Sequence, residues 1–226
     1  MKILFLGTGA ADWPTKSKDD TREYRRLSSA VIDRTLLIDP GPQVIEALNE
    51  YGINHNEIKY IINTHKHSDH YSVQTVRELE KSAAVFAEIK PGDVVKLGDY
   101  IIYSYKANHS TCDEAKHFII ADSKSKIFYG LDGAWLMYDE VEGIKSHTPD
   151  LAVFDATIGF ISGDYRIFEH NNLSMVLEMK SSLNKYIKKF CISHMAYTLH
   201  TNHSILSDAM AKENILVAYD GLEIEV

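Results

Sequence analysis

The chain has 226 residues, of which 45% are hydrophobic and 25% are charged, and its formal net charge is −8. This length and composition are typical of a globular protein, and we expect a single domain over residues 1–226. The acidic balance argues against a general nucleic-acid surface, and no apolar run approaches the roughly 18 residues of a membrane span. The two cysteines, Cys112 and Cys191, form no disulfide framework and favour a reducing, cytoplasmic location.

Strand-like and helical segments follow one another along the whole chain. Apolar runs predict strands at Lys2–Leu6, Ala30–Asp33, Leu36–Asp39, Tyr60–Asn63, Val85–Glu88, Tyr100–Lys106, His117–Ala121, Lys126–Tyr129, Leu151–Phe154, Phe190–Ser193, Ile215–Ala218 and Glu223–Val226. Helical periodicity predicts helices at Gln43–Tyr51, Val73–Lys81, Leu173–Lys188 and Ile205–Asn214. Ser72 is the expected N-cap of the second helix, and Ser204 or His203 that of the fourth. This order predicts an α/β fold of two mixed β-sheets with helices on the outer faces.

Two long segments without periodicity, Ala10–Leu27 and Thr157–Glu169, are predicted to be irregular. The first holds Trp13 and the adjacent pair Arg25 and Arg26. Long irregular loops in a compact domain are more often functional than accidental, so we expect these segments to decide substrate specificity.

The heptapeptide Thr64–His70 places three histidines and an aspartate directly after a predicted strand. Because side chains alternate along an extended chain, His65 and His67 project to the same side. The turn that follows can bring Asp69 and His70 back toward the same space. Imidazole and carboxylate together are the ligands of hydrolytic metal sites, so the segment predicts metal binding rather than a solvated turn.

Further ligands for such a site are expected at neighbouring strand ends. His109, Asp132 and His194 each follow an apolar run that is predicted to be a strand. Each of them alone is a weak signal, but their shared position supports one metal centre. Surface or capping roles are expected for the remaining histidines, namely His55, His117, His147, His200 and His203.

The segment Thr-His-Lys-His-Ser-Asp-His resembles the His-x-His-x-Asp-His signature of the metallo-β-lactamase superfamily. The order of the later residues, a histidine, an aspartate and a last histidine, also fits that superfamily. The resemblance covers nearly the whole chain and implies an αβ/βα sandwich. It implies that one metal ion is held by His65, His67 and His109, and the other by Asp69, His70 and His194. Asp132 would bridge the two ions, and Asp39 would be a supporting carboxylate behind the ligands.

Within the superfamily, the chain looks most similar to the phosphoribosyl cyclic phosphodiesterase-like branch, which is related to the tRNA 3′-processing endonucleases. The segments that carry this similarity are Tyr24–Ser29, Glu169–Leu173, Ser193–Met195 and Tyr219–Ile224. By this resemblance His170 is a catalytic histidine that does not bind metal. The chain departs from that branch in having no cysteine-rich insertion near its N-terminus and no room for a substrate-gripping arm.

The expected activity is that of a dinuclear metal-dependent phosphodiesterase acting on a small or cyclic phosphate ester. Two divalent ions, two carboxylates and a bridging hydroxide leave about one net positive charge, which suits an anionic substrate. The hydroxide would be the nucleophile and His170 the general acid, and Asp69 and His170 are the expected catalytic residues. Zinc or manganese is the expected metal, and iron or nickel also suits these ligands.

The sequence alone determines neither the substrate contacts nor the type of reaction. Arg25, Arg26 and Trp13 are candidate substrate contacts, although adjacent arginines are more often part of a solvated loop. The same metal centre could instead hydrolyse a thioester, lactone or β-lactam. A metal-binding domain without catalysis is the second alternative.

Overall fold

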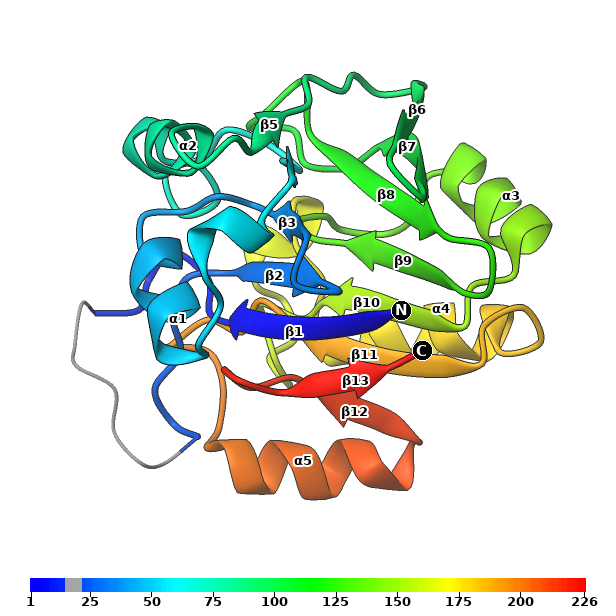
Figure 1. Ribbon diagram of the computed structural model, residues 1–226. Helices are drawn as coiled ribbons and strands as arrows, with labels where there is room; N and C mark the ends of the chain where they lie inside the picture. The colour runs from blue at the N-terminus through cyan, green and yellow to red at the C-terminus, as the bar shows by residue number, and fades with distance from the viewer. Residues whose placement is uncertain (15–21) are drawn as a thin grey trace.

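The computed structural model describes residues 1–14 and 22–226, and it contains two β-sheets packed face to face (Figure 1). The centre of the predicted loop Ala10–Leu27, residues 15–21, lies outside the described residues. The first sheet has the order β13-β1-β2-β3-β4-β5, and the second has the order β12-β11-β10-β9-β8-β7-β6. Both sheets contain parallel and antiparallel pairs, as the order of the predicted elements indicated.

The bounds of the strands lie within two residues of those predicted. The first sheet consists of β1 (Lys2–Gly7), β2 (Ser29–Ile32), β3 (Leu36–Ile38), β4 (Tyr60–Ile62), β5 (Val85–Phe86) and β13 (Glu223–Glu225). The second consists of β6 (Val94–Leu97), β7 (Tyr100–Lys106), β8 (Lys116–Ala121), β9 (Lys126–Gly130), β10 (Leu151–Asp155), β11 (Lys189–Ser193) and β12 (Ile215–Val217). Strand β6, which pairs with the edge of the second sheet, is an addition to the prediction.

The helices lie on the outer faces of the two sheets (Figure 1). They are α1 (Val44–Glu50), α2 (Val73–Glu80), α3 (Tyr138–His147), α4 (Leu173–Leu183) and α5 (His203–Lys212), with short 3₁₀ turns η1 (His55–Glu57) and η2 (Tyr165–Phe168). Ser72 caps α2 as predicted, by accepting a hydrogen bond from the backbone N–H of Thr75. The expected cap of α5 was wrong, because Asn202 accepts from the N–H of Ile205 and starts that helix earlier. No helix among the described residues is long and apolar enough to cross a bilayer.

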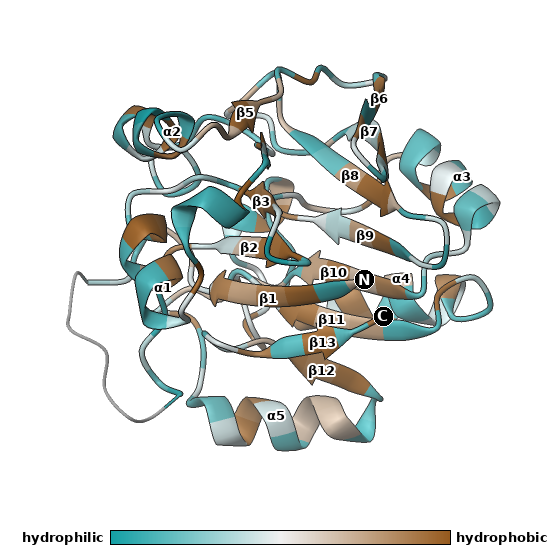
Figure 2. Ribbon diagram, viewed as in Figure 1, coloured by the Kyte–Doolittle hydropathy of each residue, from teal (hydrophilic) through white to brown (hydrophobic). Residues whose placement is uncertain are grey.

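Three layers of apolar side chains hold the sandwich together. The central layer fills the space between the sheets and includes Phe5, Phe118 and Tyr129. A second layer lies between the second sheet and its helices, and a third lies between the first sheet and α1 and α2. In Figure 2 the strands are mostly brown, whereas the helices alternate teal with white and brown, as expected of helices with one apolar face. Burial of this apolar area stabilises the two sheets at about 25 cal/mol per Å² and fixes the strand ends relative to each other.

Candidate metal centre

The predicted ligands gather at one edge of the sandwich, where several strands end. β4 precedes the Thr64–His70 loop, and β7, β9 and β11 precede His109, Asp132 and His194. β9, β10 and β11 are parallel to one another, and β7 shares their direction because β8 is antiparallel to both β7 and β9. The carboxyl ends of these strands therefore lie on one side of the second sheet, as expected for a site in this kind of sheet.

His65, His67 and His109 form a first group of possible metal ligands, with the ligand atoms within 4.8 Å of one another. The ring centroids of His65 and His67 are 4.5 Å apart, and those of His65 and His109 are 4.9 Å apart. Nε2 of His109 lies 3.2 Å from Nδ1 of His67. Burial, together with the neighbouring histidines, holds the pKa of His65 at about 2, so this ring is neutral and can offer a lone pair.

A second group consists of Asp69, His70, Asp132 and His194, all of them buried. Oδ1 of Asp132 lies 3.2 Å from Nε2 of His70 and 3.0 Å from Nε2 of His194. The other oxygen of Asp132, Oδ2, lies 3.7 Å from Nε2 of His65 in the first group. Asp132 thus faces both groups with different oxygens, which is the position of a bridging ligand.

The chemistry of these residues fits a metal cation. Nε2 of His65 and Oδ1 of Asp132 are buried without a hydrogen-bond partner among the described residues. Nε2 of His70 and Nε2 of His194 lie only 3.2 Å apart, an arrangement that a shared cation would stabilise. Burial opposes protonation of His194, but the carboxylate of Asp132 outweighs it and raises the pKa to about 10. The electrostatic field of the second group therefore attracts positive charge.

Asp39, the predicted supporting carboxylate, contacts the start of the histidine loop and one of the predicted ligands. Its Oδ1 accepts hydrogen bonds from the backbone N–H and the hydroxyl of Thr64, at 2.7 and 2.8 Å. Its Oδ2 lies 2.9 Å from Nδ1 of His70. Because Nδ1 donates to this carboxylate, Nε2 of His70 is free to face the other ligands. The carboxylate thus fixes both the start of the histidine loop and the orientation of one ring.

His170 lies beside the two groups, and its Nδ1 is 2.8 Å from Oδ2 of Asp155. Asp155 is fully buried, and its Oδ1 accepts from the backbone N–H groups of Thr157 and Asn171. Burial lowers the pKa of His170, but the charge and hydrogen bond of Asp155 outweigh this effect and raise it. Asp155 and His170, with Asp132 and His194, form a third group within 4.8 Å. We interpret the contact between Asp155 and His170 as a hydrogen-bonded pair.

Asp155 is absent from the residues that the sequence predicts for the site. The signal was present, because Asp155 ends an apolar strand in the same way that Asp132 follows one. Asp155 also approaches a predicted metal ligand, since its Oδ2 lies 3.6 Å from Nδ1 of His194. The hydroxyl of Thr157 contacts both rings, at 2.7 Å from Nδ1 of His194 and 3.2 Å from Nδ1 of His170. Asp155 therefore orients His170 directly and supports His194.

Three consecutive residues, Glu169 to Asn171, connect the loops of the site. The carbonyl oxygen of Glu169 lies 3.2 Å from Nδ1 of His109. The side chain of Glu169 accepts from the hydroxyls of Ser110 and Thr111, both at 2.7 Å. The side-chain amide of Asn171 donates to the carbonyl of Gly133 and accepts from the N–H of residue 135. The segment thus ties His170 to the loops that carry His109 and Asp132.

A pocket of about 220 Å³, open to solvent, lies over these groups. Its lining consists of Ala10, Ala11, Asp12, His67, Asp69, His109, Thr111, Asp132, Thr157, Arg166, Glu169, His170, His194 and Ala196. Among the described residues, Arg166 is the one lysine or arginine in this lining. Its guanidinium is held by a double contact with Asp164, from Nε at 2.8 Å and from Nη2 at 2.7 Å.

The three predicted substrate contacts lie outside this lining. Arg25 is buried and donates to the hydroxyl of Thr8 and to the carbonyl of Ala218. Arg26 is also buried, and its guanidinium contacts Glu46 and Glu50. Trp13 donates to the carbonyl of Met195 and, with Arg25, lines a neighbouring pocket. A direct role of these residues in substrate binding stays a prediction.

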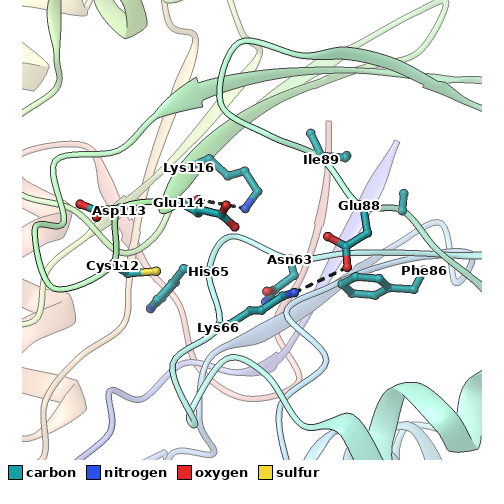
Figure 3. A pocket seen from close by; sticks show the side chains of 11 residues that line it. Asn63, His65, Lys66, Phe86, Glu88, Ile89, Cys112, Asp113, Glu114 and Lys116 are labelled. Atoms are coloured by element: carbon teal, nitrogen blue, oxygen red, sulfur yellow. Dashed lines mark hydrogen bonds and ion pairs between the residues drawn. The ribbon is translucent and has the colours of Figure 1, made fainter.

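Cys112 faces a second pocket, of about 140 Å³, that adjoins His65 (Figure 3). Cys112 belongs to none of the possible metal-binding groups in the described part of the chain. The ammonium of Lys116 in this pocket donates to the carbonyl of Thr64 at 3.1 Å. Lys116 therefore holds the start of the histidine loop from the side of this pocket. His200 contacts the carbonyl of Ala156, and His203 contacts the guanidinium of Arg25. Neither histidine belongs to the three possible metal-binding groups.

Comparisons with known proteins define the class of this fold. Among solved structures, the metallo-β-lactamase fold protein YhfI from Bacillus subtilis matches with a TM-score of 0.76 and 14% identity, covering 100% of this chain and 99% of that chain. A diphosphatase of the PhnP family matches with a TM-score of 0.74 and 18% identity, covering 100% and 96%. The short form of human tRNase Z matches with a TM-score of 0.68 and 18% identity, covering 100% and 99%.

The chain therefore has the metallo-β-lactamase fold, as the sequence resemblance predicted. A family model described as "Anti-Pycsar protein Apyc1" matches residues 1–73, which include the Thr64–His70 loop. No curated protein sequence matches the chain.

Proposed function

We propose that the protein is a metal-dependent phosphodiesterase that acts on a small, or cyclic, phosphate ester and uses two divalent ions, zinc or manganese. The observation that carries this proposal is the position of His170. It lines the same pocket as the two ligand groups, but its Nδ1 is taken by Asp155, 2.8 Å away. A fixed histidine beside a cationic centre is suited to transferring a proton, which the expulsion of an alkoxide requires.

The charge of the predicted centre favours an anionic substrate. Of the seven predicted ligands, only Asp69 and Asp132 bring negative charge, and the five histidines bring none when neutral. Divalent ions bound there would lower the pKa of water and stabilise negative charge on a phosphoryl group. The pocket volume of about 220 Å³ suits a small molecule better than a folded partner.

The residues around the centre then have separate tasks. Asp155 holds the ring of His170 by Nδ1, so that Nε2 is left to donate a proton to the leaving oxygen. Asp164 holds the guanidinium of Arg166 by Nε and Nη2, which leaves Nη1 to contact an anionic oxygen of the substrate. The backbones of Arg166 and His170 are joined directly, because the carbonyl of Arg166 accepts from the backbone N–H of His170 at 2.8 Å.

A matched substrate panel tests this proposal. Protein loaded with zinc, manganese or iron is assayed on cyclic and linear phosphodiesters and, in parallel, on a thioester, a lactone and a β-lactam. We expect turnover of the diesters, and its loss in the Asp132→Ala variant. Turnover of only the carbonyl substrates would assign the same centre to a different hydrolase. No turnover of any substrate with any of these metals would support a binding role without catalysis.

A further inference from the structure

A buried pair, His117 on β8 and Glu140 in the first turn of α3, lies behind the loop that carries Asp132. His117 is 2% exposed and Glu140 is fully buried, so the expected surface or capping role of His117 was wrong. Nδ1 of His117 lies 2.5 Å from Oε1 of Glu140, and Nε2 lies 2.9 Å from the backbone carbonyl oxygen of Asp132. Neither residue is a member of the metal-binding groups or of the lining of the pocket above them.

The direction of these hydrogen bonds follows from the groups involved. A carbonyl oxygen can only accept, so Nε2 of His117 must carry the hydrogen and donate it to Asp132. Glu140 holds the opposite side of the ring and fixes that orientation. The second oxygen of Glu140 accepts from the N–H of Met137 at 2.7 Å, which ties the pair to the start of α3.

The contact with His117 requires the glycine that follows Asp132. A Cβ atom at Gly133 would lie only 2.6 Å from Cε1 and 2.8 Å from Nε2 of His117. Such distances are shorter than any ordinary van der Waals contact. The ring thus packs directly on the backbone of residues 132 and 133, and a side chain at position 133 would displace it.

Asp132 differs from three of the predicted ligand histidines in how it is held. Oδ2 of Asp39 fixes His70, the carbonyl of Glu169 faces Nδ1 of His109, and the hydroxyl of Thr157 faces Nδ1 of His194. Each of these partners contacts the ring on the side away from the other ligands. By contrast, the ion-pair contacts of the Asp132 carboxylate within the described part of the chain are all with ligand histidines. Its position therefore depends on its backbone.

We propose that His117 and Glu140 are positioning residues that hold the backbone of Asp132, so that its two oxygens reach both ligand groups at once. A shift of this backbone would change the contacts of Asp132 with His65 and His194 together. The inference rests on metal binding at these groups, which is part of the proposed function. Loss of a residue that orients a metal ligand typically lowers metal affinity by about 10- to 100-fold.

The test separates positioning from folding. In the double variant His117→Phe with Glu140→Leu, apolar side chains of similar size replace the pair, an exchange that usually preserves stability. Affinity for Co²⁺ is measured by competition with a chelator, and the visible absorption spectrum of the bound Co²⁺ reports its coordination. His117→Gln, which keeps an N–H donor, is the conservative variant. Glu142→Gln, on the outer side of α3, is the matched control.

We expect the double variant to unfold cooperatively, to bind Co²⁺ about 10- to 100-fold more weakly and to show a changed spectrum. His117→Gln should recover part of the affinity, and the control should match the wild type. Wild-type affinity and spectrum in the folded double variant would overturn the positioning role alone. Absence of Co²⁺ binding by the wild-type protein would overturn the proposed metal centre along with it.

Discussion

Replacement of His170 by alanine removes the proposed proton donor and leaves the predicted ligands in place. The buried carboxylate of Asp155 would still accept from the backbone N–H groups of Thr157 and Asn171, at 2.9 and 3.1 Å. Its charge therefore remains hydrogen-bonded, and we expect the variant to fold. Metal content should also stay unchanged, because His170 is not one of the seven predicted ligands and its Nδ1 already contacts Asp155.

The size of the effect follows from the role of a general acid. A positioned acid contributes typically about 10²- to 10⁴-fold to the rate, which is about 3–5 kcal/mol of the barrier at 1.36 kcal/mol for each tenfold. The hydrogen bond of 2.8 Å between His170 and Asp155 orients the ring and favours its protonated form, which is the form that a general acid needs. The need for an acid falls when the leaving group is already a weak base.

The assay compares two diesters that differ only in the leaving group, an alkyl alcohol and a nitrophenol. We expect His170→Ala to lower kcat on the alkyl diester by about 10²- to 10⁴-fold and on the nitrophenyl diester by less than about tenfold. Metal content and the thermal midpoint are measured on the same samples. An equal loss on both substrates, with metal content unchanged, would refute proton donation by His170. Full activity on the alkyl diester would refute any catalytic role.

Three further predictions concern binding, pH and metal removal. Arg166→Ala should raise KM for the diester about tenfold with little change in kcat, while Arg166→Lys recovers part of the loss and the Arg77→Ala control does not differ from the wild type. Burial lowers the pKa of His200 in the folded protein from 6.5 to about 4. Below pH 6.5 the unfolded chain therefore takes up a proton that the folded chain does not, and the free energy of unfolding falls as the pH drops toward 4. Between pH 7 and pH 5, the free energy of unfolding of the metal-free protein, measured with urea, should therefore fall by about 2 kcal/mol more in the wild type than in His200→Gln. An equal fall in both proteins would show that His200 is not the cause. The metal-free protein, prepared with a chelator, should have a free energy of unfolding about 4 kcal/mol lower than the protein in free metal ion at a thousand times Kd. An unchanged thermal midpoint would argue against a bound ion.

The strands and the histidine loop could be predicted because their signals are local. An apolar run that ends in a polar ligand marks a buried strand and its carboxyl end, and this is how His109, Asp132 and His194 were found. Their convergence follows from the parallel direction of β9 and β11 and from the shared direction of β7. A sequence pattern therefore suffices for residues whose position in the fold is set by the strand that precedes them.

Helix α3 has no such local signal. Its buried side consists of Glu140, Gly143 and Ile144, so the apolar periodicity of a helix is missing. Gly143 packs against the ring of Tyr105, where a Cβ atom would lie 2.4 Å from Cζ. A polar residue and a glycine take the places that leucine or valine usually occupies, and only the tertiary contact reveals why.

The positively charged side chain of the pocket, Arg166, also could not be predicted from the sequence. The pair Arg25 and Arg26 stood out because two arginines adjoin in a predicted loop, but the fold buries both. Arg166 stands alone in a segment without periodicity. Its place in the lining depends on the turn η2 and on its contact with Asp164, which caps that turn. Long-range loop geometry of this kind leaves no trace in spacing or composition.

The proposed function requires two metal ions in one centre that hydrolyses phosphodiesters. A metal titration with activity measured at each step tests this requirement most directly. Metal-free protein is titrated with Mn²⁺ or Zn²⁺, bound ions per chain are counted by native mass spectrometry, and hydrolysis of the alkyl diester is measured in parallel. We predict that two ions bind per chain and that activity rises with the second ion. Activity that is complete in metal-free protein, or two bound ions without hydrolysis of any phosphodiester, would contradict it.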